Sequence, residues 1–120
     1  MGETISLTTS DGHTLDAYKA TPTGAVKGGL VVVQEIGAAV QEVASAGKVS
    51  VIGFCFGGYA TFVAACKVDG ISAAMPFYGG GIAAKVGDMQ PKCPTQIHFG
   101  DKDAAIPLDD LQKIKDALQD

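Results

Sequence analysis

Apolar residues are spaced in two different ways along the chain, and the difference indicates two kinds of strand. In residues 3–9 and 13–20 they alternate with polar residues on either side of Ser10-Asp11-Gly12, which predicts an antiparallel β-hairpin. Later segments are short and continuously apolar, as in strands buried in a parallel sheet. These segments are Leu30–Val33, the strand that Lys48 opens and that runs to Ile52, and Ile71–Tyr78. A further strand is predicted at Thr95–Gly100.

Helical spacing separates the continuous segments. The predicted helices are a short one over 38–46 with Val40 and Val43 inward, a buried one through Ala60–Ala65, a loose one after 79–81, and an amphipathic one over 107–119. One face of the last helix carries Leu108, Leu111, Ile114, Lys115 and Leu118. Strands that alternate with helices predict an α/β fold with a mostly parallel sheet, and 120 residues predict a single domain, 1–120.

Composition narrows the classes of function. The chain is 47% apolar and 18% charged, its net charge is −4, and its nine basic residues are all lysine. An acidic chain without arginine offers no basic stripe, so we expect no nucleic-acid partner. No apolar run approaches the length that spans a membrane, and we expect no membrane partner. Three cysteines without a charged-then-apolar leader favour a cytoplasmic location over a disulfide scaffold.

The most distinctive stretch is Gly53-Phe-Cys55-Phe-Gly57-Gly58, where an apolar strand meets a helix. Its spacing matches the nucleophile elbow of α/β-hydrolases, with a cysteine sulfur where a serine oxygen is usual. Glycines are expected there because the nucleophile has a strained backbone and the neighbouring elements approach closely. Two other interpretations stay open, a structural buried cysteine and a phosphate-binding turn. The second lacks the G-x-G-x-x-G and Gly-Lys-Ser/Thr sequences of nucleotide sites.

Two carboxylates are candidates to act beside Cys55. Asp103 follows the last predicted strand, and Glu35 follows the first continuous apolar strand. Because the carboxyl ends of parallel strands meet at one edge of a sheet, both should lie on the edge that carries Cys55. Either could instead cap the helix that follows it, and from the residues alone a cap is the more ordinary role for Asp103. Cys66 and Cys93 look structural, and no Cys or His spacing predicts a metal site.

Four motifs, in this order, resemble signatures of the dienelactone hydrolase family. They are Gln34-Glu35-Ile36, Gly53-Phe-Cys55-Phe-Gly57-Gly58, Phe77-Tyr78-Gly79-Gly80-Gly81 and Phe99-Gly100-Asp101-Lys102-Asp103-x-x-Ile106-Pro107. The resemblance implies a three-layer α/β-hydrolase fold that works without a cofactor or a metal. It also implies hydrolysis of the ester bond of a small unsaturated lactone.

The same resemblance implies roles for single residues. Cys55 matches the family's nucleophile, Asp103 its triad acid, and Glu35 the carboxylate that hydrogen-bonds the resting thiol. The N–H groups of Ile36 and Phe56 match its oxyanion hole. A nucleophile, a carboxylate and two backbone donors form a coherent set for acyl transfer, so we expect a small ester or lactone as the substrate.

The chain departs from the family pattern in length. The stretch that should follow Glu35, with a strand, helices and a substrate-binding arginine, is missing, and the sequence stops at Asp120, before the region of the triad histidine. Of the two histidines, His13 lies in the predicted hairpin, and His98 is expected to face a helix layer as a core residue. We therefore expect a contracted fold that is either a weak cysteine esterase or a catalytically silent scaffold or binding module.

The shortened pattern also bears on assembly. In the family, the missing strand lies between the hairpin and Leu30–Val33, so its loss should expose an apolar strand edge. We expect a homodimer, or a strand exchange, that covers this edge.

Overall fold

The structure is a computed structural model that describes residues 1–9, 11–32 and 37–118. In chain order the elements are β1 (Gly2–Thr8), β2 (Thr14–Ala20), β3 (Gly28–Val32), α1 (Gly37–Val43), η1 (Ala44–Ala46), β4 (Lys48–Phe54), α2 (Phe56–Lys67), β5 (Ile71–Phe77), η2 (Ile82–Ala84) and α3 (Leu108–Leu118), where η marks a 3₁₀ turn. The predicted antiparallel hairpin and the alternation of parallel strands with helices are confirmed.

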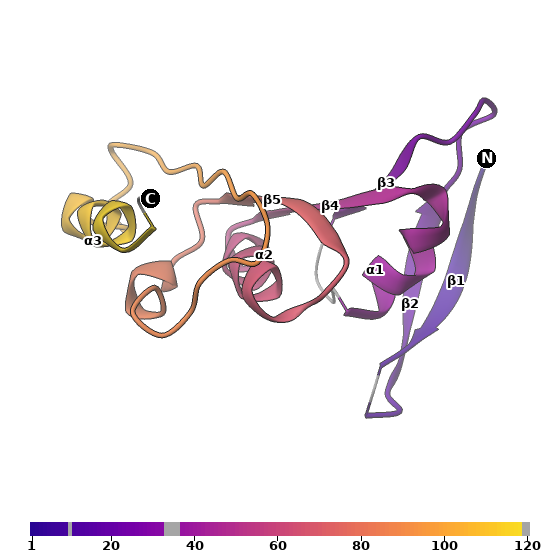
Figure 1. Ribbon diagram of the computed structural model, residues 1–120, viewed down its shortest axis with the longest axis horizontal. Helices are drawn as coiled ribbons and strands as arrows, with labels where there is room; N and C mark the ends of the chain where they lie inside the picture. The colour runs from indigo at the N-terminus through magenta and orange to yellow at the C-terminus, as the bar shows by residue number, and fades with distance from the viewer. Residues whose placement is uncertain (10, 33–36, 119–120) are drawn as a thin grey trace.

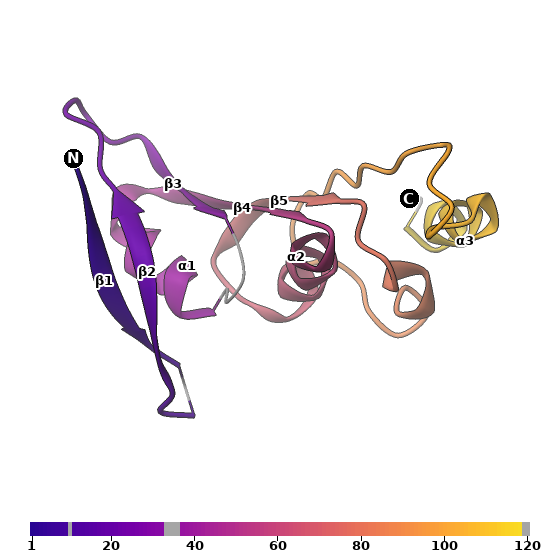
Figure 2. The same cartoon turned by 180° about the vertical axis from the view of Figure 1, so that it is seen from behind.

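The three parallel strands form one layer in the order β3-β4-β5, and α1 and α2 lie against the same face of it (Figures 1 and 2). Each helix connects two neighbouring strands, and both connections advance in the same direction along the sheet. Right-handed connections that advance in one direction put their helices on one face. The α/β class is thus as predicted, whereas the third layer of the expected three-layer sandwich is absent from the residues described.

The sheet face without helices carries exposed apolar side chains. Leu30 and Val32 of β3 are 58% and 68% exposed, and Phe54 at the end of β4 is 46% exposed. Val31 lies between Leu30 and Val32 on β3, and its register partner on β4 is Val51. Both valines point to the helix side and are buried. We call the side that includes Leu30, Val32 and Phe54 the open face.

The hairpin β1–β2 is a separate two-stranded sheet at the β3 end of the molecule (Figure 1). Its strands pair from Gly2↔Ala20 to Thr8↔Thr14. Neither strand pairs with β3, so one edge of β3 has no strand beside it among the residues described. A cavity of about 520 Å³ lies between the hairpin, β3 and α1.

The prediction of a strand at Thr95–Gly100 is wrong, because this segment forms two isolated parallel bridges beside β5. Thr95 pairs with Ala74 and His98 pairs with Phe77. The N–H of Gln96 donates to Ala74 O (3.0 Å) and the N–H of His98 to Pro76 O (2.9 Å). Pro76 has no N–H to donate in return, so the ladder is interrupted between the two bridges.

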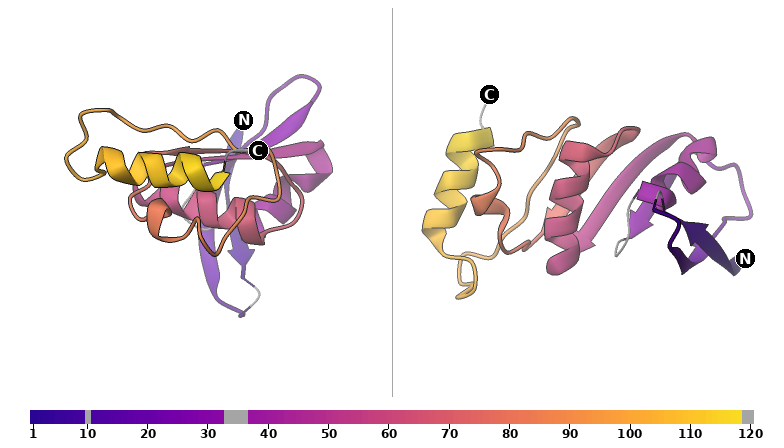
Figure 3. Two further views of the ribbon diagram at one scale, coloured as in Figure 1. Left: turned by 60° about the vertical axis from the view of Figure 1, so that its left-hand side comes forward. Right: turned by 90° about the horizontal axis from the view of Figure 1, so that it is seen from below.

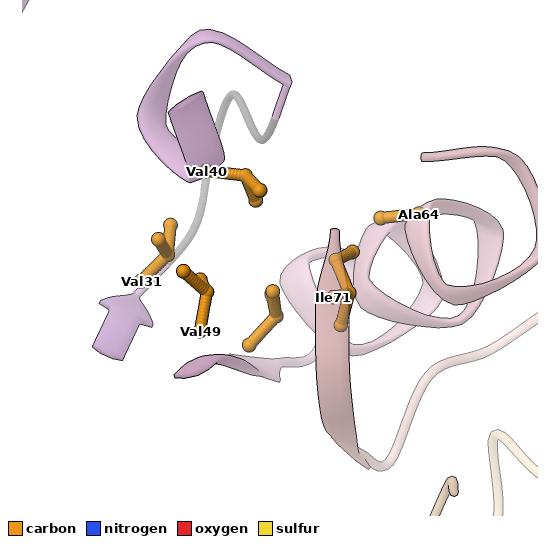
Figure 4. Close-up of a cluster of buried hydrophobic side chains, with 6 residues drawn as sticks. Val31, Val40, Val49, Ala64 and Ile71 are labelled. Carbon is orange, nitrogen blue, oxygen red and sulfur yellow. The ribbon is translucent and has the colours of Figure 1, made fainter. Parts of the chain in front are cut away.

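Two groups of buried side chains hold the elements together. The first lies between the sheet and the helices α1 and α2 and is shown in Figure 4. Its members are Val31, Val40, Val49, Val51, Ala64 and Ile71. The second lies on the far side of α2, toward η2 and α3: Phe62, Cys66, Ile82, Val86 and Ile114. Because α2 contributes to both groups, it is the central helix of the fold.

The elements follow one another along the long axis, with the hairpin at one end and α3 at the other (Figure 3). The extents are 43 × 30 × 25 Å and the radius of gyration is 15.2 Å, above the roughly 14 Å typical of a compact chain of this length. On α3, Ile114 is buried as predicted, whereas Leu108 is 60% exposed. No helix of the described residues combines the length and apolar character needed to cross a bilayer.

Candidate active site

Cys55 lies at the corner between β4 and α2, and its backbone is strained. Its φ and ψ are 56° and −121°, in a region that residues with a side chain seldom adopt. Its carbonyl oxygen accepts hydrogen bonds from the N–H groups of Gly58 (2.9 Å) and Tyr59 (3.2 Å), which start α2. The thiol is exposed and belongs to no disulfide. The corner therefore presents a sulfur atom to solvent at a helix N-terminus.

The glycines around the corner leave no room for a side chain. A Cβ at Gly53 would lie 2.1 Å from the carbonyl oxygen of Gly57 and 2.5 Å from the Thr61 hydroxyl. A Cβ at Gly58 would lie 2.2 Å from the carbonyl oxygen of Phe77. Gly57 is itself buried. The strand, the helix and the end of β5 thus approach one another backbone to backbone.

A second strained residue, Tyr78, follows β5 beside this corner. Its φ is 38°, and with Cys55 it completes the non-glycine residues of positive φ in the described chain. The N–H of Cys55 donates to Phe77 O (3.1 Å), and the N–H of Tyr78 donates to His98 O (2.7 Å). A Cβ at Gly79 would lie 2.5 Å from the N atom of Tyr59. The turn after β5 therefore braces the Cys55 corner. The sequence pattern assigned Tyr78 no such role, although the Phe77-Tyr78-Gly79 motif was the signal for it.

Aromatic side chains flank Cys55. The ring of Phe54 lies 5.0 Å from that of Phe77 and 6.3 Å from that of Tyr78, and the ring of Phe56 lies 6.2 Å from that of Tyr59. Phe56 and Tyr78 are 70% and 44% exposed. Large apolar rings that stay exposed at a strained corner are candidates for ligand contact.

His98 lies on the open face and not toward the helices, which corrects the expectation from the sequence. Its parallel bridge with Phe77 gives the two side chains the same orientation, and its ring stacks on the Phe77 ring at 4.3 Å with an interplanar angle of 6°. The neighbours Ile97 and Phe99 instead contact the second core group. His13 is exposed in the hairpin. No hydrogen bond joins either imidazole to Cys55 in the portion of the chain described.

Asp103 makes a local hydrogen bond. Its carboxylate accepts the N–H of Ala105 (2.9 Å), and its carbonyl oxygen accepts the N–H of Ile106 (3.2 Å). This is a turn-forming Asx arrangement, close to the capping interpretation that the sequence left open. Asp103 lies in the loop after the bridged segment, and β5 lies between that segment and the strand leading to Cys55.

Two predicted site residues, Glu35 and Ile36, lie outside the described residues. Of the two predicted oxyanion donors, Phe56 is described, and as the first residue of α2 its N–H has no acceptor within the helix. No backbone acceptor outside the helix receives it among the residues described. A donor of this kind next to a nucleophile could stabilise an oxyanion.

The other two cysteines differ from Cys55. Cys66 is buried on α2, and this burial, reinforced by the nearby Cys93, raises the pKa of the Cys66 thiol. Cys93 is half-buried, with its sulfur 4.0 Å from the Thr95 hydroxyl. Within the described ranges, no three His, Cys, Asp or Glu side chains gather in a way that could hold a metal ion.

Comparison with known proteins points to one family. The family model described as "Dienelactone hydrolase family" matches residues 38–120, more than half of the chain. A crystal structure from Klebsiella pneumoniae subsp. pneumoniae MGH 78578, provisionally described as a dienelactone hydrolase, is 17% identical with a TM-score of 0.71. That match covers 99% of this chain and 80% of the other, and at such identity it shows the fold alone. No curated protein matches.

Proposed function

Because the chain belongs to the dienelactone hydrolase family, we propose that it acts on ester or lactone bonds through the thiol of Cys55. The observation that carries the proposal is the strained, exposed Cys55 at the corner of β4 and α2, with the N–H of Phe56 beside it. In the acylation step the sulfur attacks the ester carbonyl, a C–S bond forms, and the alcohol leaves with the thiol proton. The Phe56 N–H would donate to the oxyanion.

Release of the acyl group is the step that we propose to be impaired in the 120-residue chain. Deacylation requires a group that activates water, and a histidine oriented by a carboxylate is the usual arrangement. In the described residues the Asp103 carboxylate bonds to Ala105 N–H, and the His98 ring stacks on Phe77. The acyl-enzyme should therefore accumulate after one round of acylation.

The experiment is to mix the chain with p-nitrophenyl acetate and follow both product release and protein mass. We expect a burst of about one p-nitrophenol per chain, one acetyl group on Cys55, and later turnover near background. Cys66 and Cys93 are internal controls because they are buried and half-buried, and Cys55→Ala should abolish both burst and adduct. An adduct elsewhere, or none, would refute the nucleophile. Sustained turnover that depends on Cys55 would refute only the impairment.

A second candidate is a catalytically silent scaffold or binding module that keeps the corner because the fold needs it. The observation in its favour is that the corner glycines make backbone contacts with α2 and β5, which serve packing whether or not the thiol reacts. In this case Cys55→Ala should leave every property except thiol chemistry unchanged. The p-nitrophenyl acetate experiment separates the two candidates, because a scaffold shows no burst.

A further inference from the structure

The surroundings of Cys55 suggest what kind of substrate it would accept. Phe54 precedes Cys55 in the chain, and its ring is close to those of Phe77 and Tyr78. Phe77 is joined to Cys55 through the backbone hydrogen bond from the Cys55 N–H. Phe54 and Tyr78 therefore form an exposed aromatic surface beside the corner that carries Cys55, and the spacing of their rings is within the range of favourable aromatic pairs.

No guanidinium group is available to a substrate at this edge of the sheet. The chain has no arginine, and three of its nine lysines, Lys19, Lys92 and Lys113, are in ion pairs with carboxylates. Lys48 begins β4, about 20 Å from the Phe54 end at strand spacing. Lys67 ends α2, about 18 Å from Cys55 at helical rise.

One lysine, Lys102, does follow the segment bridged to β5, but it stands between Asp101 and Asp103 in the sequence. Two neighbouring carboxylates offset a single ammonium group. A substrate carboxylate would thus find no guanidinium clamp, and an uncharged substrate would find two exposed rings.

The backbone of Tyr78 adds an independent observation. Its φ of 38° is costly for a residue with a large side chain, and such strain is retained where the surrounding structure or a function requires it. Asparagine and glycine adopt this conformation more readily than tyrosine, so bracing the corner does not by itself call for an aromatic ring. The ring, and not the backbone, is what tyrosine contributes.

On the basis of the function proposed above, we propose that Phe54 and Tyr78 bind the acyl group of the substrate, and that this group is aromatic and uncharged. The acyl group would lie on the two rings while its carbonyl carbon meets the sulfur of Cys55. Phe54 and Tyr78 are then specificity-determining residues for acylation.

The test measures acylation of Cys55 by mass spectrometry with three ethyl thioesters, of phenylacetic, acetic and succinic acid. In each reaction the bond from the carbonyl carbon to ethanethiol breaks, the bond to the Cys55 sulfur forms, and ethanethiol takes the thiol proton. Each rate is divided by the rate with N-acetylcysteine, which removes differences in intrinsic reactivity. We expect phenylacetyl to exceed acetyl at least threefold, and succinyl to be slowest.

Two variants locate the effect. Tyr78→Asn keeps a residue that accepts positive φ and removes the ring, and Phe54→Thr keeps a residue suited to a strand. Each should lower the ratio of the phenylacetyl rate to the acetyl rate about three- to tenfold, as the loss of one aromatic contact implies. The matched control is Tyr18→Thr, which removes a 74% exposed tyrosine from the hairpin and should change neither rate.

The outcomes separate this inference from the function on which it rests. If no thioester acylates Cys55, the proposed nucleophile is refuted. If Cys55 is acylated with equal normalised rates, or fastest by the succinyl thioester, only the substrate class is refuted. If Tyr78→Asn lowers the acetyl and phenylacetyl rates equally, Tyr78 serves the corner alone and the specificity role is overturned.

Discussion

The corner at Cys55 and the β3 edge of the parallel sheet contact their neighbouring elements in different ways. At the corner of β4, α2 and β5, glycine backbones touch carbonyl groups, and an added methyl group would meet main-chain atoms at little more than 2 Å. At the β3 edge, the hairpin stands across a cavity of about 520 Å³ and pairs with no strand of the sheet. The candidate site therefore lies where the backbone has the least room to move, and the hairpin lies where the packing leaves the most room.

The largest expected effect on stability comes from adding a side chain at the closely packed Cys55 corner. Gly58→Ala would put a methyl group 2.2 Å from the carbonyl oxygen of Phe77, which belongs to a strand and cannot rotate away. We expect a loss of about 3 kcal/mol or more in the free energy of unfolding, enough to prevent folding if the native chain is marginal. Urea denaturation followed by circular dichroism measures it. The matched control, Gly80→Ala, has no heavy atom within 4 Å of the new carbon and should change stability by less than about 0.5 kcal/mol. Equal midpoints for the two variants would contradict the comparison.

The β3 edge offers a test of oligomeric assembly. We propose that a second copy of the chain adds a strand at the β3 edge, because that edge is apolar and has no strand beside it in the described residues. Leu30→Lys, at a 58% exposed position, should convert a dimer to a 12.2 kDa monomer without unfolding it. Light scattering over a range of concentrations measures the mass. Leu108→Lys, at a 60% exposed leucine of α3, should leave the dimer intact. A wild-type chain that is monomeric at every concentration would rule the proposal out.

A smaller effect on stability is expected from a substitution in the buried side chains behind the Cys55 corner. Thr61 is fully buried, and its hydroxyl has no hydrogen-bond partner among the described residues. Thr61→Val keeps the shape and removes the unsatisfied hydroxyl, so we expect a gain of about 1 kcal/mol in unfolding free energy. Chemical denaturation of the variant beside the wild type is the measurement. A loss of stability would mean that the hydroxyl does have a hydrogen-bond partner in solution.

The smallest effect concerns the contact between hairpin and α1. Lys19 of β2 and Glu42 of α1 form an ion pair at 2.6 Å, and the hydrogen bond and charge of Glu42 raise the pKa of Lys19. A lysine whose folded pKa is raised contributes stability below its unfolded pKa of about 10.4, and this contribution disappears as the pH rises through the folded value. In Glu42→Gln, NMR titration of the Lys19 Cε resonance should show the pKa fall toward its ordinary value. An unchanged titration would mean that the pair does not link hairpin and helix in solution.

Sequence patterns predicted which elements form, because alternation, apolar runs and helical spacing act over a few residues. The hairpin, the parallel strands at Gly28–Val32 and Lys48–Phe54, and the helix that starts after Cys55 all follow the predicted order. The strand β3 begins at Gly28 and not at Leu30, since the glycines there are free to join the ladder with β4. The position of the corner at Cys55 was readable in the same way, whereas its role as a nucleophile remains a prediction.

The sequence alone determined the local features of this protein: the hairpin, the alternation of strand and helix, and a glycine-bounded cysteine between β4 and α2. The tertiary structure decided which face each element occupies. It put both helices on one side because successive crossovers advance in one direction, and it turned His98 to the open face because the segment is in register with Phe77. It also interrupted the ladder beside Pro76 and brought Tyr78 against the corner. These outcomes depend on pairing between residues far apart in the chain, which no local pattern contains.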